Sequence, residues 1–340
     1  MNIVFLTRFY KPHVGGVERH VEEVGKQLLK LGYDVKVITT RYDSNLKNKE
    51  KIKGIEVLRF QQPKIRFFGL IYTWIWLITK IRLFRDCDIV HIHDVFIWYL
   101  PLRLILTRKR VFITFHGYPD YPIPKQALFF QRIAQNLTEG NITIGRFIEK
   151  WYGTKSDIVS CGAVELKKFK PDKKNKYEYD ALFSSRLDDQ TGILTYLDAV
   201  KIIRKKGIYF KILVLGDGKY KKQADEIANT KGWVADPSKY YNRCQFAFVN
   251  RYLGVLEAFA SKKLVFAVYD NPLKKDYLYM TPFEKWIIIE NNPKNLAEEI
   301  IYYKNNKKKS DEMVRKAYRW VQSQTWEKMA KHYLNLWNVK

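Results

Sequence analysis

The feature that most constrains the fold of this chain is a repeated switch between two hydrophobic periods. Residues 2–6 form a short apolar run typical of a buried strand, and apolar residues three and four apart then mark a helix from Val17 to Leu31. Residues 33–39 return to a strand pattern and complete a βαβ unit. The same alternation recurs along the chain. It predicts an α/β fold of doubly wound, Rossmann-like parallel sheets.

A chain of 340 residues is long enough for two such domains. Residues 167–178 are highly charged, include a proline and lack hydrophobic periodicity, which is typical of an interdomain linker. We therefore expect an N-terminal domain over residues 1–166 and a C-terminal domain over residues 179–321. The carboxyl ends of the two sets of strands are expected to face a cleft.

The chain is strongly basic, with 61 Lys and Arg against 35 Asp and Glu, which gives a net charge of +26. Such an excess favours phosphate-bearing partners: nucleic acid, an anionic lipid surface or a nucleotide ligand. The lysines are spread through the chain and are not gathered on one element, so we expect no nucleic acid as partner. A basic nucleic-acid-binding protein stays as the weaker alternative.

The cysteine and histidine spacings predict neither a metal site nor a disulfide framework. Cys87, Cys161 and Cys244 lie far apart. His91 and His93 alternate on one strand, but no third ligand stands at a useful spacing, so we interpret both as sheet-packing residues. The sequence enters its first strand at once, without the pattern of a signal peptide, and we expect a cytoplasmic protein.

Residues 67–79 are apolar and aromatic, with Arg66 before them and Lys80, Arg82 and Arg85 after them. Thirteen residues are too few to span a bilayer, which needs about 20. Two interpretations stay open: a helix lying on an anionic membrane surface, or a crossover helix packed against the sheet. Residues 96–106, followed by a basic run, favour the first. They suggest a protein peripheral to the inner face of the cell membrane.

In the first domain, chemically active residues follow the predicted strands. Gly15 and Gly16 would let a ligand approach the start of a helix, where an anion is favoured, although an ordinary turn explains them equally well. No Gly-x-Gly-x-x-Gly follows a strand, which counts against a nicotinamide oxidoreductase. His116 ends a strand and precedes a glycine, so its ring should point toward the cleft. Asp94 is a second candidate there.

In the second domain, Arg186 precedes a helix and is suited to a diphosphate. The alternative is an ion pair with Asp188 or Asp189. The sequence Gly216-Asp-Gly218 marks a tight turn after the next strand. Glu257 lies in an apolar helical run between two strands, where a buried carboxylate needs a partner. That partner is either a ligand or the helix dipole and backbone N–H groups.

The order and spacing of six motifs resemble the GT-B nucleotide-sugar glycosyltransferases of the family 4 type. The motifs are Gly-Gly-Val-Glu-Arg-His (15–20), His-Ile-His-Asp (91–94), Thr-Phe-His-Gly (114–117), Ser-Arg-Leu (185–187), Leu-Gly-Asp-Gly (215–218) and Leu-Glu-Ala-Phe-Ala-Ser-Lys-Lys-Leu-Val (256–265). The resemblance covers nearly the full length and implies a C-terminal helix, about residues 322–340, that crosses back to the first domain.

The resemblance implies a retaining enzyme that moves a hexose from a nucleoside diphosphate sugar, such as UDP- or GDP-hexose, to an acceptor hydroxyl. The basic, aromatic helices favour a lipid-linked or membrane-surface glycan acceptor. No Asp-x-Asp motif follows a strand, so we expect no metal and no cofactor beyond the donor.

The resemblance also assigns site residues. The implied catalytic residues are His116 beside the donor sugar, Arg186 at the diphosphate and Glu257 at the ribose hydroxyls. The full set of expected donor-binding residues is Gly15, Gly16, Arg186, Gly216, Asp217, Gly218, Arg251, Leu253, Gly254 and Glu257. The expected acceptor-side residues are His13, Asp94 and Tyr118.

Two positions depart from the family pattern. Thr191 stands where the family has a lysine at the diphosphate, and Val249 stands where it has a first glutamate near the donor sugar. Loss of one well-placed group of this kind can cost about 100-fold in rate. Arg251 is a candidate substitute. The alternative is a nucleotide-sugar-binding protein with impaired catalysis.

Overall fold

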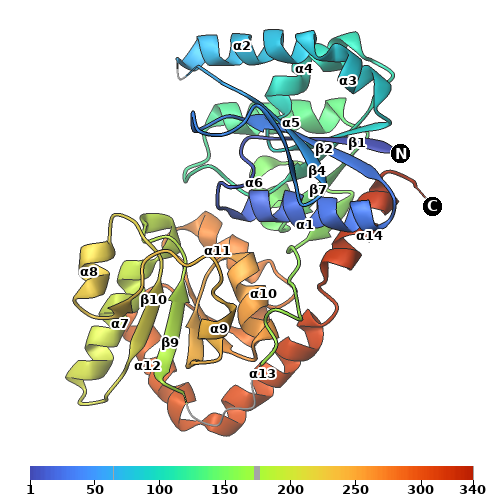
Figure 1. Cartoon of the computed structure of the whole chain (residues 1–340). Helices are drawn as coiled ribbons and strands as arrows, with labels where there is room; N and C mark the ends of the chain where they lie inside the picture. Colours follow the sequence, from blue (N-terminus) through green and yellow to red (C-terminus); the bar gives the residue numbers. More distant parts are fainter. Residues whose placement is uncertain (64, 172–176, 340) are drawn as a thin grey trace. The chain divides into compact units, whose positions relative to one another are not determined.

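The computed structural model describes residues 1–63, 65–171 and 177–339, and these form two compact units (Figure 1). Unit 1 comprises Met1–Ser160 with Trp326–Lys340, and unit 2 comprises Cys161–Thr325. Both are parallel-sheet α/β units, which confirms the predicted fold class.

In unit 1 the described strands form one sheet in the order β3-β4-β2-β1-β5-β6-β7-β8. The strands are β1 (Asn2–Thr7), β2 (Asp34–Thr40), β3 (Lys49–Ile52), β4 (Ile55–Phe60), β5 (Ile89–His93), β6 (Arg110–Phe115), β7 (Gly140–Ile144) and β8 (Ile158–Ser160). Only β3, which pairs with β4, runs antiparallel among them. The helices are α1 (Gly16–Lys30), α2 (Arg66–Thr79), α3 (Ile81–Asp86), α4 (Phe96–Ile105), α5 (Lys125–Leu137), α6 (Phe147–Tyr152) and α14 (Trp326–Leu336).

The strand order of unit 1 reverses between β1 and β5. From β1 the chain crosses through α1 to β2 on one side, and from β5 it crosses through α4 to β6 on the other side. Because crossovers between parallel strands are right-handed, α1 lies on one face of the sheet and α2, α4 and α5 on the opposite face. Helix α14 packs beside α1. Ligands of doubly wound sheets bind outside the carboxyl ends of the strands at such a reversal.

Unit 2 has a described sheet of parallel strands in the order β11-β10-β9-β12-β13-β14. The strands are β9 (Tyr179–Ser184), β10 (Ile212–Leu215), β11 (Asn229–Thr230), β12 (Cys244–Phe248), β13 (Leu264–Val268) and β14 (Ile287–Glu290). The helices are α7 (Ile193–Lys205), α8 (Lys221–Asp225), α9 (Ser238–Tyr241), α10 (Tyr252–Ala260), α11 (Pro272–Tyr279), α12 (Pro293–Asn305) and α13 (Lys307–Val321), with 3-10 turns at Asp189–Thr191 and Glu284–Trp286. Here the order reverses between β9 and β12.

The core of unit 2 forms where α7 and α12 cover its sheet. Tyr196 of α7 stacks on Phe248 of β12, with ring centroids 4.9 Å apart, and its hydroxyl donates to the carbonyl of Phe266 at 2.9 Å. Both rings are fully buried. The apolar strand runs in the sequence thus correspond to strands that are covered on both faces.

The unit boundary falls at Ser160, whereas the sequence placed it after residue 166. The segment after Ser160 already packs within unit 2: the N–H of Val164 donates to the carbonyl of Gln324 at 3.0 Å. Of the predicted linker 167–178, residues 172–176 lie outside the described residues. The C-terminal helix expected at about residues 322–340 corresponds to α14, whose residues belong to unit 1.

Candidate functional site

Three loops of unit 2 meet at the point where its strand order reverses. Arg186 follows β9, the Gly216–Gly218 turn follows β10, and Arg251 follows β12 and precedes α10. Because neighbouring parallel strands end at the same edge, residues that are dozens of positions apart come together there. The structure therefore brings the predicted donor-binding residues of unit 2 to one sheet edge.

Glycine is required in the Gly216–Gly218 turn because it packs directly on the loop that carries Arg186. The N–H of Leu187 donates to the carbonyl of Asp217 at 2.9 Å. Gly218 has φ +149°, and a Cβ there would lie 2.6 Å from the carbonyl oxygen of Leu187; one at Gly216 would overlap the carbonyl of Ser185. The two glycines thus fix the position of the Arg186 loop.

The guanidinium of Arg186 is accessible. Its side chain is 71% exposed, and its Nε lies 3.3 Å from Oδ2 of Asp188, which is the ion pair that the sequence left as an alternative. A pair this exposed contributes little, about 0–1 kcal/mol, so the guanidinium can exchange it for a ligand phosphate. Asp189 pairs instead with Lys219 and with the hydroxyl of Tyr220.

A second guanidinium lies at the same edge. Arg251 precedes α10, and its Nη2 donates to the side-chain oxygen of Gln190 in the Arg186 loop at 2.7 Å. Leu253 and Gly254 follow in the first turn of α10, and Glu257 lies in the second turn, 6% exposed. Glu257 therefore occupies the place that the sequence predicted, near the positive end of a helix dipole.

The two positions that depart from the family pattern are both buried. Val249 is 3% exposed and Thr191 is 1% exposed. Between them, the side chain of Asn250 donates to the carbonyl oxygens of Thr191 at 3.0 Å and Val268 at 3.2 Å. The backbone at Thr191 is thus held by a hydrogen bond from the side chain of Asn250, the residue that follows Val249.

Lys274 of α11 is a buried amino group that the sequence did not single out. Its Nζ donates to the carbonyl of Asn250 at 2.7 Å and lies 4.2 Å from the ring centre of Tyr277. Burial, followed by the nearby charge of Arg251, holds the pKa of this ammonium well below its usual range. No sequence period distinguishes Lys274 from Lys275 beside it.

In unit 1, His116 immediately follows β6 and is held from two sides. Its Nε2 lies 2.9 Å from Nδ1 of His93, at the end of β5, and its backbone N–H donates to Oδ1 of Asp94 at 2.8 Å. Asp94 adopts φ +63°, a conformation that aspartate tolerates better than most residues. Packing around its carboxylate raises the pKa of Asp94, and the hydrogen bond from the His116 N–H and the exposure of the residue to water oppose this rise.

A buried hydrogen-bond chain runs through the core below His116. The indole of Trp337 donates to Nδ1 of His91 at 3.1 Å, so the proton of the neutral His91 ring is on Nε2, which donates to Thr114 at 2.8 Å. The hydroxyl of Tyr333 lies 2.9 Å from both Thr114 and Nε2 of His20. Both aromatic residues come from the C-terminal part of unit 1.

All four histidines of this region are neutral, because burial lowers the pKa of His20 to about 3 and holds those of His91, His93 and His116 well below the usual value. His91 and His93 are indeed buried in the sheet, as expected. His93 also contacts His116, the candidate site residue. The alternating pattern of β5 could not indicate this contact.

The space at the start of α1 is occupied by a side chain of the protein itself, that of Glu18. Oε1 of Glu18 lies 2.6 Å from Nδ1 of His13, and the Glu18 carboxylate occupies the space where a side chain on Gly15 would lie. Glu18 is 6% exposed. A ligand phosphate near Gly15 and Gly16 would therefore have to displace this carboxylate.

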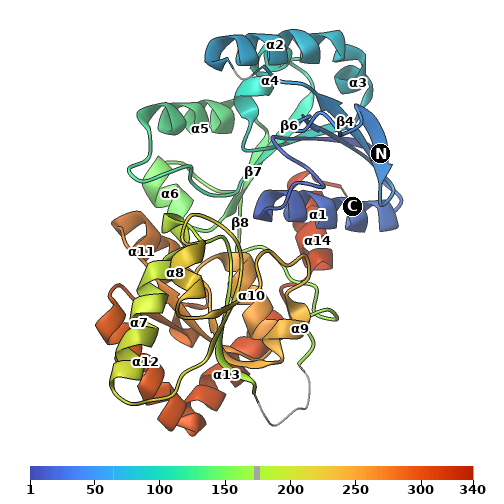
Figure 2. The same ribbon diagram turned by 60° about the vertical axis from the view of Figure 1, so that its left-hand side comes forward.

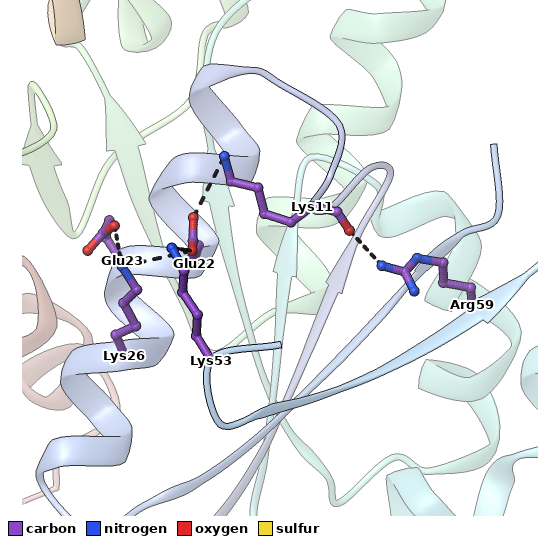
Figure 3. A network of polar contacts seen from close by, with 6 residues as sticks. All are labelled: Lys11, Glu22, Glu23, Lys26, Lys53 and Arg59. Carbon is purple, nitrogen blue, oxygen red and sulfur yellow. Dashed lines mark hydrogen bonds and ion pairs between the residues drawn. The ribbon is translucent and has the colours of Figure 1, made fainter. Parts of the chain in front are cut away.

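Charged contacts fix the loop before Gly15 (Figure 3). The buried carboxylate of Glu22 in α1 lies 3.7 Å from Lys11, 3.8 Å from Lys26 and 2.6 Å from Lys53. The guanidinium of Arg59 donates to the carbonyl of Lys11 at 2.6 Å. These contacts attach the loop both to α1 and to β4.

Tyr118, the remaining acceptor-side candidate, lies two residues after His116. Its ring meets Phe147 edge to face, with centroids 5.8 Å apart. The hydroxyl of Tyr152 donates to the carbonyl of Gly117 at 3.4 Å. Within the described ranges, no three His, Cys, Asp or Glu side chains come together as ligands for a metal ion.

Comparison with protein families places both halves of the chain. Residues 14–161 match the model of Glycosyltransferase Family 4, and residues 164–320 match that of Glycosyl transferases group 1. The chain belongs to the GT-B glycosyltransferases. The family assignment makes the protein a glycosyltransferase and confirms the resemblance seen in the motifs.

Solved GT-B structures share the fold over nearly the whole chain. Sucrose-phosphate synthase from Thermosynechococcus elongatus superposes with a TM-score of 0.78 at 15% identity, covering 99% of this chain and 98% of the other. A glycosyltransferase from Rickettsia africae gives 0.75 at 18% identity, with coverage of 99% and 97%. Anabaena HepE, solved with UDP, gives 0.75 at 14% identity, with coverage of 99% and 100%.

A curated relative of this glycosyltransferase is the phosphatidylinositol N-acetylglucosaminyltransferase GPI3 subunit of Saccharomyces cerevisiae. The two are 30% identical over 95 residues, which is 27% of this chain. The match spans 21% of the length of the yeast subunit.

Proposed function

We propose that this glycosyltransferase is a retaining enzyme that moves a hexose from a nucleoside diphosphate sugar to the hydroxyl of a lipid-linked or membrane-surface glycan. The observation that carries the proposal is the edge of unit 2, where the accessible guanidinium of Arg186, the guanidinium of Arg251 and the carboxylate of Glu257 follow neighbouring strands. HepE, which shares the fold, was solved with UDP and glucose, and that supports a nucleotide-sugar donor.

The proposed chemistry follows from charge. As the bond between the sugar and the diphosphate breaks, positive charge develops on the sugar ring and negative charge on the departing diphosphate. Arg186 and Arg251 would stabilise the departing charge, which a divalent cation stabilises in many other transferases. Glu257 would accept hydrogen bonds from the two ribose hydroxyls, and His116 would position the sugar.

The acceptor is inferred from the N-terminal half and from the yeast relative, whose name describes transfer to phosphatidylinositol. The aromatic, cation-flanked segment at residues 66–85 supports an acceptor at a membrane surface. We accordingly propose that the protein works in the cytoplasm at the inner face of the cell membrane. Within the part of the chain that the structure describes, no helix is long and apolar enough to cross a bilayer.

The test begins with a thermal-shift screen of nucleotide sugars, because a ligand that binds only the folded state raises the melting temperature. The best donor is then supplied to the wild type and to Arg186→Ala, and release of the nucleoside diphosphate is measured. We expect a fall of about 100-fold for the variant. Unchanged turnover by a folded Arg186→Ala protein would show that the donor does not bind at the proposed site.

The buried Val249 and Thr191 favour one second candidate, a protein that binds the nucleotide sugar without transferring it. It predicts a thermal shift with a donor but no release of nucleoside diphosphate above the level of Arg186→Ala. Turnover by the wild type would exclude it. Salt-sensitive binding to generic duplex without a donor shift would instead favour nucleic-acid binding.

A further inference from the structure

Helix α2 is apolar on its outer side as well as on the inner side, where Leu77 is fully buried. Thr73, in the middle of the helix, is fully buried, where its hydroxyl donates to the carbonyl of Gly69 at 2.7 Å and accepts from Gln62 at 3.0 Å. Trp74 also faces inward, and its indole donates to the carbonyl of Ile97 in α4 at 2.8 Å. The inner side of α2 therefore makes the hydrogen bonds that a surface helix normally leaves to water.

The outer side of α2 is an apolar stripe at helical spacing. Phe68 is 66% exposed, Ile71 46%, Ile75 58% and Ile78 39%. Residues three and four apart lie on one helix face, so these four side chains form one row. A helix that only covered a sheet would carry polar residues there, as α13 of unit 2 does with Lys307, Lys308 and Lys309 among its exposed residues.

The neighbouring helices continue this apolar surface. Helix α2 packs on α4, and α4 packs on α5, which places all three on one side of unit 1 (Figures 1 and 2). Leu104 and Ile105 at the end of α4 are 65% and 54% exposed, and Phe129 of α5 is 60% exposed. Exposed apolar residues gathered in this way mark an interaction surface.

The charge of these helices identifies the partner. Helices α2 to α5 contain six basic residues and one acidic residue, Asp86, which pairs with the adjacent Arg85 at 3.1 Å. The six are Arg66, Arg82, Arg85, Arg103, Lys125 and Arg132. Exposed Lys80 and Arg108 add positive charge in the connections. An aromatic, apolar stripe with exposed cations on the adjoining helix, such as Arg82 and Arg85, is suited to a surface of anionic lipid, where the stripe enters the headgroup region and the cations meet phosphates.

We propose that the outer side of α2, with the exposed apolar residues of α4 and α5, docks unit 1 onto an anionic bilayer. This deepens the proposed function and rests on it for its purpose, because docking would hold the enzyme where a lipid-linked acceptor lies. The binding itself does not depend on transfer, so the two can fail separately.

The test is flotation with vesicles of phosphatidylcholine, with and without phosphatidylglycerol. We expect the wild type to float with the anionic vesicles and Ile71→Glu/Ile75→Glu to bind them at least about tenfold more weakly, since two apolar side chains no longer enter the lipid. Arg82→Ala/Arg85→Ala should weaken binding on the order of tenfold at low salt and less at high salt. The matched control is Leu194→Glu/Tyr209→Glu, at exposed apolar positions of unit 2, which should bind as the wild type does.

The inference is overturned if the wild type ignores anionic vesicles, or if the control pair loses binding as strongly as the α2 pair. It is also overturned if light scattering shows a dimer that Ile71→Glu/Ile75→Glu dissociates, because a second copy would then cover the stripe. Donor hydrolysis is measured on all variants without vesicles. Hydrolysis without docking would leave the proposed transfer intact, whereas docking without hydrolysis would contradict the transfer alone.

Discussion

Nδ1 of His93 lies 2.9 Å from Nε2 of His116, and the other nitrogen of His93 is buried without a hydrogen-bond partner among the described residues. A buried N–H without a partner costs more than a buried lone pair without one. We therefore place the His93 proton on Nδ1, where it donates to His116. His116 must then carry its own proton on Nδ1, which makes that nitrogen a hydrogen-bond donor for a ligand.

His93→Phe should remove this orientation without touching a ligand. We expect kcat for donor hydrolysis to fall about tenfold, the size of one buried hydrogen bond, with little change in donor affinity. His93→Asn, whose amide N–H can replace Nδ1–H, should recover most of the rate. Equal rates for the Phe and Asn variants would show that packing, and not the hydrogen bond, is what His93 provides.

The buried histidines predict sensitivity to acid. The folded-state pKa values of His20, His91 and His93 lie below the usual 6.5, so the unfolded chain takes up protons that the folded chain does not. Their stabilising contribution is present above about pH 6.5 and is lost as the pH falls, by about 1.4 kcal/mol per group and pH unit.

Urea unfolding between pH 7.5 and 5.5, followed by hydrogen exchange of β5 and β6, measures this loss. His20→Gln should reduce by about one the number of protons that the chain takes up on unfolding in this pH range. A free energy of unfolding that stays constant across this range would contradict the neutral cluster.

Gly218→Ala should both destabilise unit 2 and weaken the donor site. The substitution combines a φ of +149° with a contact of 2.6 Å to the backbone of Leu187, and we expect a loss of about 3 kcal/mol in the free energy of unfolding. Gly207→Ala is the control, because its φ is +75° but its Cβ would meet nothing within 4 Å. It should cost about 1 kcal/mol and leave nucleotide affinity unchanged. Similar losses for the two variants would argue against the packing described for this turn.

Turnover should persist without divalent cations, because the guanidinium groups of Arg186 and Arg251 can neutralise the charge of the diphosphate. We expect the rate of donor hydrolysis in excess EDTA to remain within about twofold of the rate with Mg²⁺. If the rate of donor hydrolysis falls in EDTA and added Mg²⁺ restores it, the donor must bind together with a metal ion.

Restoring the family's lysine at position 191 should not improve the enzyme. Thr191 is 1% exposed, and its hydroxyl donates to the carbonyl of Asp188 at 2.7 Å, so Thr191→Lys places an ammonium in a closed, hydrogen-bonded site. We expect a lower melting temperature and no gain in turnover. A gain of tenfold or more would instead support the view that the natural chain is catalytically impaired.

The sequence predicted the central strands well because parallel strands covered on both faces are continuous apolar runs. It missed β3, whose sequence Lys-Glu-Lys-Ile is that of a polar edge strand, and α5, for which no element was predicted. Short or edge elements depend on tertiary pairing that a local period does not contain.

The residues of the candidate site could be predicted from the sequence only where they follow a strand whose end could be predicted. Arg186, Arg251 and Glu257 could be placed because each follows a recognisable strand. The bond between His93 and His116 could not, because it depends on the register of β5 on β6, in which His93 is opposite Thr114. Glu18 over Gly15, and Lys274 below Asn250, likewise arise from folded geometry.

The contribution of α14 to unit 1 determines the order in which the chain can be completed during translation. Unit 2 has all its residues once Thr325 has been synthesised, whereas His20, His91 and Thr114 receive their partners only when Tyr333 and Trp337 leave the ribosome. The domain made first is therefore finished last, and until then its buried histidines lack the hydroxyl and the indole that satisfy them.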